Sequence, residues 1–246
     1  MPDADETANR KVLDRLQAAL AGDERIGPRF RPARLALDSD GVLILEAEVA
    51  TVAQKKIVLE TAAAFPEIAG IVDRVRVKPA SEMGDGEIRA HLRRAFTEDP
   101  ALSGLVVREY RGHDCRTVAA PADARGSLDF EVVDGVVTLN GSVPGLATKR
   151  YAGVLAWWVP GSRDVVNGIE VAGDEADGPD RIAEAVRQAL EKDPFVDAAQ
   201  VKVGVRGRVV RLTGLLPDAE RREMAENDAW CVFGVDTVIN EIAIGS

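Results

Sequence analysis

The stretch AWWVPGSRDVVNGIEV, from Ala156 to Val171, occurs a second time in nearly the same form as AWCVFGVDTVINEIAI, from Ala229 to Ile244. A tryptophan, a glycine and an asparagine fall at the same places in both stretches. Self-similarity of this kind is the signature of an internal repeat, and a repeat determines how the whole chain is organised.

The repeat extends further back along the chain than these two stretches. GVVTLNG precedes the first copy, RVVRLTG precedes the second, and GVLILEA followed by GIVDRVRV forms a weaker copy nearer the start. The spacing of matching positions is 33 residues in all three copies, from Val42 to Val75, from Val136 to Ile169 and from Val209 to Ile242. This constant spacing indicates three copies of one unit.

Hydrophobic periodicity predicts the elements of each unit. Ile182, Val186 and Leu190 recur with the period of a helix, which ends before Pro194, and the first two copies repeat this pattern. Two alternating apolar runs follow, and in the first two copies the turn between them contains Asp-Gly, a strong hairpin signal. A second helix has a small-residue inner face, and a final strand closes the unit. The inner-face residues are Ala152, Ala156 and Val159, matched by Ala225, Ala229 and Val232.

The predicted fold class is therefore α+β, with three tandem αββαβ units. Each unit is expected to form a small three-stranded mixed sheet with two helices on one face. The predicted boundaries are 8–78, 85–172 and 179–245, called below the first, second and third repeats. The second repeat carries 21 extra residues, an insertion near 103–126 that we expect to be a solvated or partner-contacting loop.

The unit resembles the BON domain (bacterial OsmY and nodulation). The residues that carry the resemblance are the DGVVTLNGSV hairpin, the small-residue helix and the VPG…VVNGIEV ending. The first repeat departs from the pattern, with Ala47 in place of Gly141 and Gly214 and Asp73 in place of Asn167 and Asn240. The resemblance implies a non-catalytic module that binds protein partners or phospholipid membranes, often in envelope or osmotic stress, with no catalytic or cofactor-binding residues.

The composition of the chain disfavours some classes of binding partner and cofactor. The formal net charge is −10, which disfavours nucleic acid because phosphate affinity depends on Lys and Arg. Two cysteines provide neither a disulfide framework nor a zinc pattern. We find no secretory signal and no apolar run long enough to span a bilayer, so a cytoplasmic location is expected.

Several residues are candidates for structural or binding roles. Gly41 and Gly135 are expected in hairpin turns that require positive φ, and Gly161 and Gly234 at left-handed ends of the second helices. Helical geometry places three tryptophans at the margin of the helix–sheet interface. They are interpreted either as edge packing or as aromatic contacts for a partner or membrane: Trp157, Trp158 and Trp230.

Two further clusters have alternative interpretations. The basic run is either a solvated face or a site for anionic headgroups or an acidic partner, and consists of Arg25, Arg29, Arg31 and Arg34. His91 lies on an apolar helix face and is expected to be partly buried at the core edge. The insertion contains His113 and Cys115, too few groups for a metal site or an activated thiol.

The sequence thus predicts a binding or scaffolding protein, non-enzymatic and stress-related, without metal or cofactor, that contacts protein partners. The alternative is a peripheral phospholipid-binding protein that uses the basic run or the Trp157–Trp158 edge. A metal or thiol enzyme centred on the insertion of the second repeat is the least favoured hypothesis.

Overall fold

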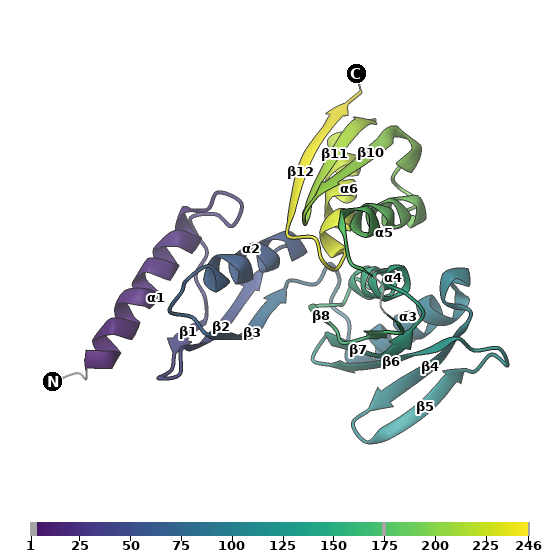
Figure 1. Cartoon of the computed structure of the whole chain (residues 1–246), viewed down its shortest axis with the longest axis horizontal. Helices are drawn as coiled ribbons and strands as arrows, with labels where there is room; N and C mark the ends of the chain where they lie inside the picture. Colours follow the sequence, from purple (N-terminus) through teal and green to yellow (C-terminus); the bar gives the residue numbers. More distant parts are fainter. Residues whose placement is uncertain (1–3, 174–175, 246) are drawn as a thin grey trace. The chain divides into compact units, whose positions relative to one another are not determined.

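The computed structural model of the chain describes residues 4–173 and 176–245 (Figure 1). Contacts divide the chain into two compact units, Met1–Lys78 and Pro79–Ser246. The first unit contains the first repeat, and the second unit contains the other two. Helices and small mixed sheets make up each unit, so the α+β prediction is confirmed.

The first unit follows the predicted order of helix, two strands, helix and strand. Its elements are α1 (Ala4–Gly22), β1 (Arg34–Leu37), β2 (Val42–Val49), α2 (Val52–Ala63) and β3 (Gly70–Val77). Strand β2 pairs antiparallel with β1 and parallel with β3. Val12, Leu16 and Leu20 on one face of α1 are buried, as the helical spacing predicts.

The second repeat contains a larger sheet than predicted. Its elements are α3 (Asp85–Glu98), the 3-10 turn η1 (Pro100–Leu102), β4 (Leu105–Arg111), β5 (Asp114–Ala119), β6 (Gly126–Val133), β7 (Val136–Val143), α4 (Leu146–Trp157), β8 (Asp164–Asn167) and β9 (Glu170–Val171). The strand order is β5-β4-β6-β7-β8, and β9 also pairs with β7. Six strands form this sheet, where the sequence predicts three.

The expected loop at 103–126 is a β-hairpin, which corrects the prediction. Strands β4 and β5 pair antiparallel, and β4 pairs parallel with β6, so the hairpin widens the sheet. Leu105 and Val107 alternate inward as in any half-buried strand, but the next inward position is Glu109, which is 1% exposed. Arg93 and Arg111 each approach its carboxylate, at 2.7 and 2.8 Å. The buried charge interrupts the apolar alternation that would otherwise reveal the strand.

The third repeat has the same element order as the first unit. Its elements are α5 (Pro179–Lys192), the 3-10 turn η2 (Ala198–Gln200), β10 (Val201–Arg206), β11 (Val209–Leu216), α6 (Ala219–Cys231) and β12 (Thr237–Ile244). Strand β11 pairs antiparallel with β10 and parallel with β12. Ala225, Ala229 and Val232 are fully buried, which places the inner face of α6 where the sequence predicts it.

The repeated asparagine ties the last strand to the second helix. Asn167 Nδ2 donates to the carbonyl oxygen of Lys149 in α4 at 2.8 Å, and Asn240 Nδ2 donates to that of Arg222 in α6 at 3.0 Å. In both repeats the side-chain oxygen accepts the backbone N–H two residues later, at 3.3 and 3.2 Å. An amide side chain satisfies both requirements because it carries a donor and an acceptor.

In the first repeat an ion pair replaces this amide. Asp73 Oδ1 accepts the N–H of Val75 at 2.8 Å, but a carboxylate has no donor for the helix carbonyl. Lys55, at the position equivalent to Lys149, lies instead with its Nζ 2.5 Å from Asp73 Oδ2 and donates to the Val75 carbonyl at 2.7 Å. Lys55 is 7% exposed, so it belongs to the interior and not to the basic surface.

Three of the four predicted turn glycines have the expected backbone. Gly41, Gly135 and Gly234 have φ of 76°, 76° and 92°. Gly161 has a φ outside the left-handed region, so the prediction was wrong about its role. A Cβ at Gly161 would lie 2.6 Å from the Cβ of Met83, so close packing is what requires glycine there.

The second and third repeats pack through helix α4. It contacts both α5 and α6, and Figure 1 shows α4 beside α5. Val154 of α4 is buried in the core of the third repeat. Arg150 is fully buried, and it donates from Nε to the Phe233 carbonyl at 2.8 Å and from Nη2 to Asp177 Oδ1 at 2.7 Å. Helix α4 therefore contributes buried residues to the hydrophobic cores of both the second and the third repeat.

Candidate functional site

The end of α4 carries the tryptophan that links the two repeats. Trp158 caps α4 and packs against the cores of both the second and the third repeat. Its indole Nε1 donates to Asp228 Oδ1 of α6 at 2.9 Å. This hydrogen bond fixes the ring between two hollows, and Trp158 lines both of them.

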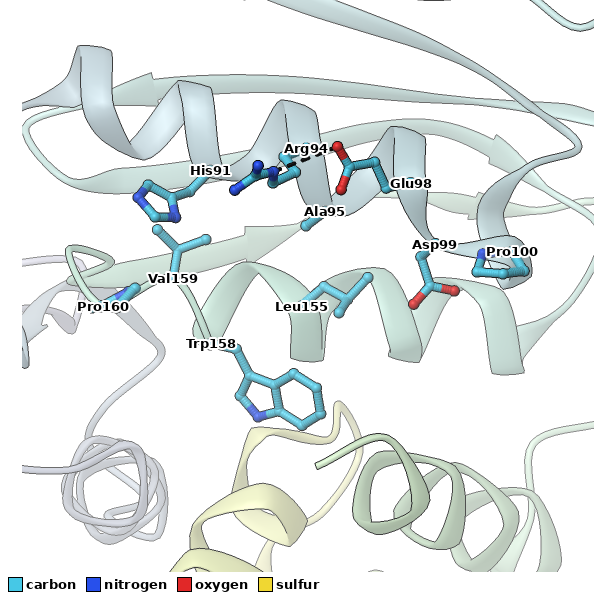
Figure 2. A pocket seen from close by; sticks show the side chains of 10 residues that line it. All are labelled: His91, Arg94, Ala95, Glu98, Asp99, Pro100, Leu155, Trp158, Val159 and Pro160. Atoms are coloured by element: carbon cyan, nitrogen blue, oxygen red, sulfur yellow. Dashed lines mark ion pairs between the residues drawn. The ribbon is translucent and has the colours of Figure 1, made fainter. Parts of the chain in front are cut away.

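The first hollow lies between α3 and α4 and is called here the α3–α4 hollow (Figure 2). It measures about 440 Å³ and is lined by His91, Arg94, Ala95, Glu98, Asp99, Pro100, Leu155, Trp158, Val159 and Pro160. His91 is exposed at its edge, whereas the sequence predicts partial burial in the core margin. Arg94 and Glu98 pair with each other at 3.4 Å, so their charges are matched.

Asp99 connects this hollow to the third repeat. Its Oδ2 accepts the hydroxyl of Tyr151 at 2.5 Å, and Lys192 of α5 lies 3.6 Å from its Oδ1. Burial, together with the hydrogen bond to Asp99, raises the pKa of the Tyr151 hydroxyl, so this group stays protonated. Both contacts anchor helices and leave no reactive group at Asp99.

The second hollow lies between the end of α4, the segment after α5, and α6. It is called here the acid hollow, measures about 330 Å³, and is lined by Trp158, Asp193, Pro194, Phe195, Met224, Asn227 and Asp228. Phe195 is 62% exposed, an unusual state for a phenylalanine. Asp193 Oδ1 accepts the N–H of Phe195 at 2.8 Å, which holds this aromatic residue beside the carboxyl pair.

Asp228 is the most perturbed group of the site. It is 6% exposed, and burial together with the Asp193 carboxylate raises its pKa to about 8, against the opposing effect of the Trp158 N–H. Its Oδ2 has no hydrogen-bond donor within the described part of the chain. Asp228 is therefore largely protonated at neutral pH, and its proton serves a hydrogen bond to Asp193.

The acid hollow presents a small set of chemical groups. Its lining offers two carboxyl groups, an amide, a thioether and aromatic rings, and no serine, cysteine or histidine among the described residues. Nor do residues 4–173 and 176–245 gather three His, Cys, Asp or Glu side chains that could hold a metal ion. The two carboxyl groups and the aromatic walls can bind a ligand that complements them.

The predicted basic run lies at the surface of the first unit. Arg25, Arg29, Arg31 and Arg34 are all exposed. Arg25 pairs with Asp23 at 2.7 Å, and Arg31 donates to the backbone carbonyls of Pro28 and Phe30 at 3.1 and 2.7 Å. Two of the four guanidinium groups thus have partners within the run itself.

The three tryptophans do not share one environment. Trp157 is half-buried, Trp158 lines the two hollows, and Trp230 is 2% exposed. The Trp230 ring is almost fully buried, so it offers no surface to a second protein or a membrane. His113 and Cys115 are exposed at the tip of the β4–β5 hairpin, far along the chain from the other histidine.

Sequence reasoning singled out Trp158 but missed its neighbours. Asp193, Phe195 and Asp228 form the acid hollow, and none of them belongs to a motif. One signal was present: Asp228 occupies the helix position at which the second repeat has the apolar Leu155. A carboxyl group at an apolar position of a repeat is a sign of a specialised site.

In the described part of the chain, no helix has both the length and the apolar character needed to cross a membrane. No curated protein matches the sequence. Two solved structures resemble the chain with 15% identity and a TM-score of 0.25, both of CdsD, a structural protein of the type III secretion system of Chlamydia trachomatis. The C-terminal-domain structure covers 91% of this chain and 95% of its own length, and the other covers 90% of each. These TM-scores are too low for the likeness to bear on function.

The family of the chain is shown by its sequence. The model of the BON domain matches residues 117–173 and 179–246, which together make up just over half of the chain. These segments contain β6 to β9 of the second repeat and the whole of the third, with helices α4 and α6 that contribute to the two hollows. The chain therefore belongs to the BON domain family, a family of non-enzymatic binding modules.

Proposed function

We propose that this chain is a non-catalytic binding protein that contacts a protein partner through the Trp158 surface, meaning the two hollows on either side of Trp158 together with Phe195. The observation that carries the proposal is Phe195, which is 62% exposed beside the acid hollow. Exposed aromatic residues next to pockets are typical of interaction sites, and Trp is enriched among residues that dominate binding energy.

The position of this surface supports a role for the tandem arrangement. Trp158 comes from the second repeat, whereas Asp193, Phe195 and Asp228 come from the third. The third repeat alone would lack the Trp158 wall of the acid hollow. We further propose that the first repeat is a divergent BON domain, because its element order and sheet order equal those of the third. A further module on the same chain would raise avidity through effective concentration.

Site-specific photo-crosslinking in cells that express the full chain tests this function. A photoreactive phenylalanine analogue replaces Phe195 in one variant and Leu215 in a control, since Leu215 is 51% exposed on β11 and lies outside the lining of either hollow. We expect a discrete protein adduct from position 195 and none from position 215. The purified adduct partner should then bind Trp158→Ala at least about tenfold more weakly than wild type. Equal adducts at both positions, or undiminished binding by Trp158→Ala, would contradict the proposal.

The sequence also predicts phospholipid binding as an alternative, a stress-related role and a cytoplasmic location. Phospholipid binding through the basic run is the alternative function, and its test is given in the Discussion. The stress-related role follows from the resemblance, and is checked by measuring survival of a deletion strain under osmotic shock. The cytoplasmic location is checked by cell fractionation.

A further inference from the structure

We propose that the acid hollow is a receptor site for a cationic side chain, an arginine or a lysine, presented by a basic segment of the protein partner. The inference rests on the proposed function, because it names the chemistry by which the Trp158 surface recognises its partner. It stands on three features of the hollow: a buried carboxyl oxygen that no N–H donor of the described residues reaches, a second carboxylate, and aromatic and aliphatic walls.

The buried oxygen is Asp228 Oδ2. Asp228 is 6% exposed and lines the hollow, and no N–H donor from the described residues reaches this oxygen. In the free chain the proton that Asp228 holds serves its hydrogen bond to Asp193. A guanidinium or ammonium group in the hollow would replace that proton with N–H donors and a positive charge. Its charge would also be shared with Asp193, whose carboxylate lines the same hollow.

The walls fit the remainder of such a side chain. Trp158 and Phe195 provide aromatic surfaces, which attract cations over their faces, and Met224 provides a flexible apolar surface for a methylene stem. The indole N–H of Trp158 is already donated to Asp228 at 2.9 Å, so the ring is held in place before a ligand arrives. Preorganised walls reduce the entropy lost on binding.

The charges around the hollow favour a cation. Among the described residues, Asp193 is the charged group that perturbs Asp228, and both are acidic. The neighbouring Lys192 is engaged elsewhere, since its Nζ lies 3.6 Å from Asp99 and 5.7 Å from the centre of the Tyr151 ring. Trp158 on α4 does not titrate, and Met224 and Asn227 on α6 are neutral. The net charge of −10 also attracts a basic partner over longer distances.

Protonation of Asp228 should make cation binding depend on pH in a characteristic way. In the free chain Asp228 holds its proton up to about pH 8. A bound cation favours the ionised carboxylate, so binding below that pH must release a proton. Affinity for a cation should therefore rise with pH until Asp228 is ionised in the free chain as well, and become constant above that point.

The experiment uses the full ¹⁵N-labelled chain and follows the indole N–H resonances by NMR. The probes are Nα-acetyl-arginine amide and its neutral isostere Nα-acetyl-citrulline amide, both at millimolar concentrations suited to weak single-residue ligands. We expect the arginine probe to shift the Trp158 indole resonance saturably, and to bind at least about tenfold more tightly at about pH 8 than at about pH 6. The citrulline probe should cause no saturable shift.

Two variants and a control complete the test. Asp228→Asn keeps the shape of the side chain and an oxygen for the Trp158 N–H, and should abolish the saturable shift. Asp193→Asn should weaken binding and provides a second measurement if the first variant is poorly folded. Glu223→Gln removes the same charge from an exposed position of α6 and should bind as wild type does. No saturable shift with the wild-type chain at about pH 8, or an equal shift in Asp228→Asn, would overturn the inference.

The outcome is separable from that of the proposed function. If the arginine probe fails to bind while crosslinking at position 195 still yields a Trp158-dependent partner, the surface binds protein by other chemistry and only this inference falls. If the probe binds with the expected pH dependence while no partner is captured, the cation site stands and the proposed function falls.

Discussion

Substitution of Asp228 by asparagine should stabilise the Pro79–Ser246 unit, and the gain should depend on pH. The amide introduced by Asp228→Asn is neutral at every pH, its oxygen could still accept the Trp158 N–H, and its nitrogen could donate to Asp193. The variant thus imitates the protonated aspartic acid. The wild-type group ionises near 3.8 when unfolded but near 8 when folded, because burial and Asp193 disfavour the charge.

The direction in which stability changes with pH follows from the protons bound by the folded and unfolded chains. Between these two pH values the folded chain holds one more proton than the unfolded chain, so the free energy of unfolding falls as pH rises. The penalty is absent below about pH 4, grows by about 1.4 kcal/mol per pH unit, and is complete above about pH 8. The full difference amounts to about 6 kcal/mol as an order of magnitude. Asp228→Asn should therefore match wild type near pH 4 and exceed it by several kcal/mol near pH 8.

Urea unfolding followed by tryptophan fluorescence measures this difference. All three tryptophans lie in the Pro79–Ser246 unit, so the signal does not report on the first repeat. Glu223→Gln is the matched control, since it removes an exposed carboxylate from the same helix. The reasoning is refuted if the difference between wild type and Asp228→Asn is constant from about pH 5 to about pH 8.

Three further predictions concern packing and the alternative function. Gly161→Ala places a Cβ 2.6 Å from Met83 and should destabilise the second unit by about 1–3 kcal/mol in the same urea assay, whereas Gly204→Ala, with nothing nearer than 4.0 Å, should not. Asp73→Asn removes the carboxylate that pairs with the buried Lys55 at 2.5 Å and should cost the first unit about 3 kcal/mol by hydrogen exchange. Glu46→Gln, which breaks the exposed 3.9 Å pair with Arg74, should cost at most about 1 kcal/mol. If the chain binds phospholipid through the basic run, it should float with anionic vesicles at low salt, and joint replacement of Arg29, Arg31 and Arg34 by Glu should abolish flotation. Absence of wild-type flotation under every condition would remove that alternative.

The elements that sequence reasoning located are those whose signal is local. The helical spacing of Val12, Leu16 and Leu20 and the Asp-Gly turns before Val42 and Val136 depend only on near neighbours along the chain. The hairpin in the second repeat was missed because its inward face contains Glu109, and that carboxylate is tolerated only through its arginine partners, two of which lie on helix α3. A buried ion pair of this kind cannot be recognised from the alternation of one strand.

The site was predicted only in part for the same reason. A helical wheel places Trp158 at the margin of its own repeat, but its partner Asp228 is 70 residues away in the chain. The wheel also treats Trp157 and Trp230 as equivalent, although one is half-buried and the other fully enclosed. Packing of one repeat against another decides these environments, and no local pattern encodes it.

The contrast between what the repeats share and where they differ locates the function. The shared residues are structural: Asn167 and Asn240 tie strand to helix, and Gly135 forms a turn. The second helices differ at many positions, and at two of them Leu155 and Trp158 of the second repeat correspond to Asp228 and Cys231 of the third. Of these four residues, Trp158 and Asp228 meet across the junction at 2.9 Å and line the acid hollow together. Copies that served only to repeat one binding surface would not need to differ there, so the junction between repeats, and not any single repeat, is where we place recognition.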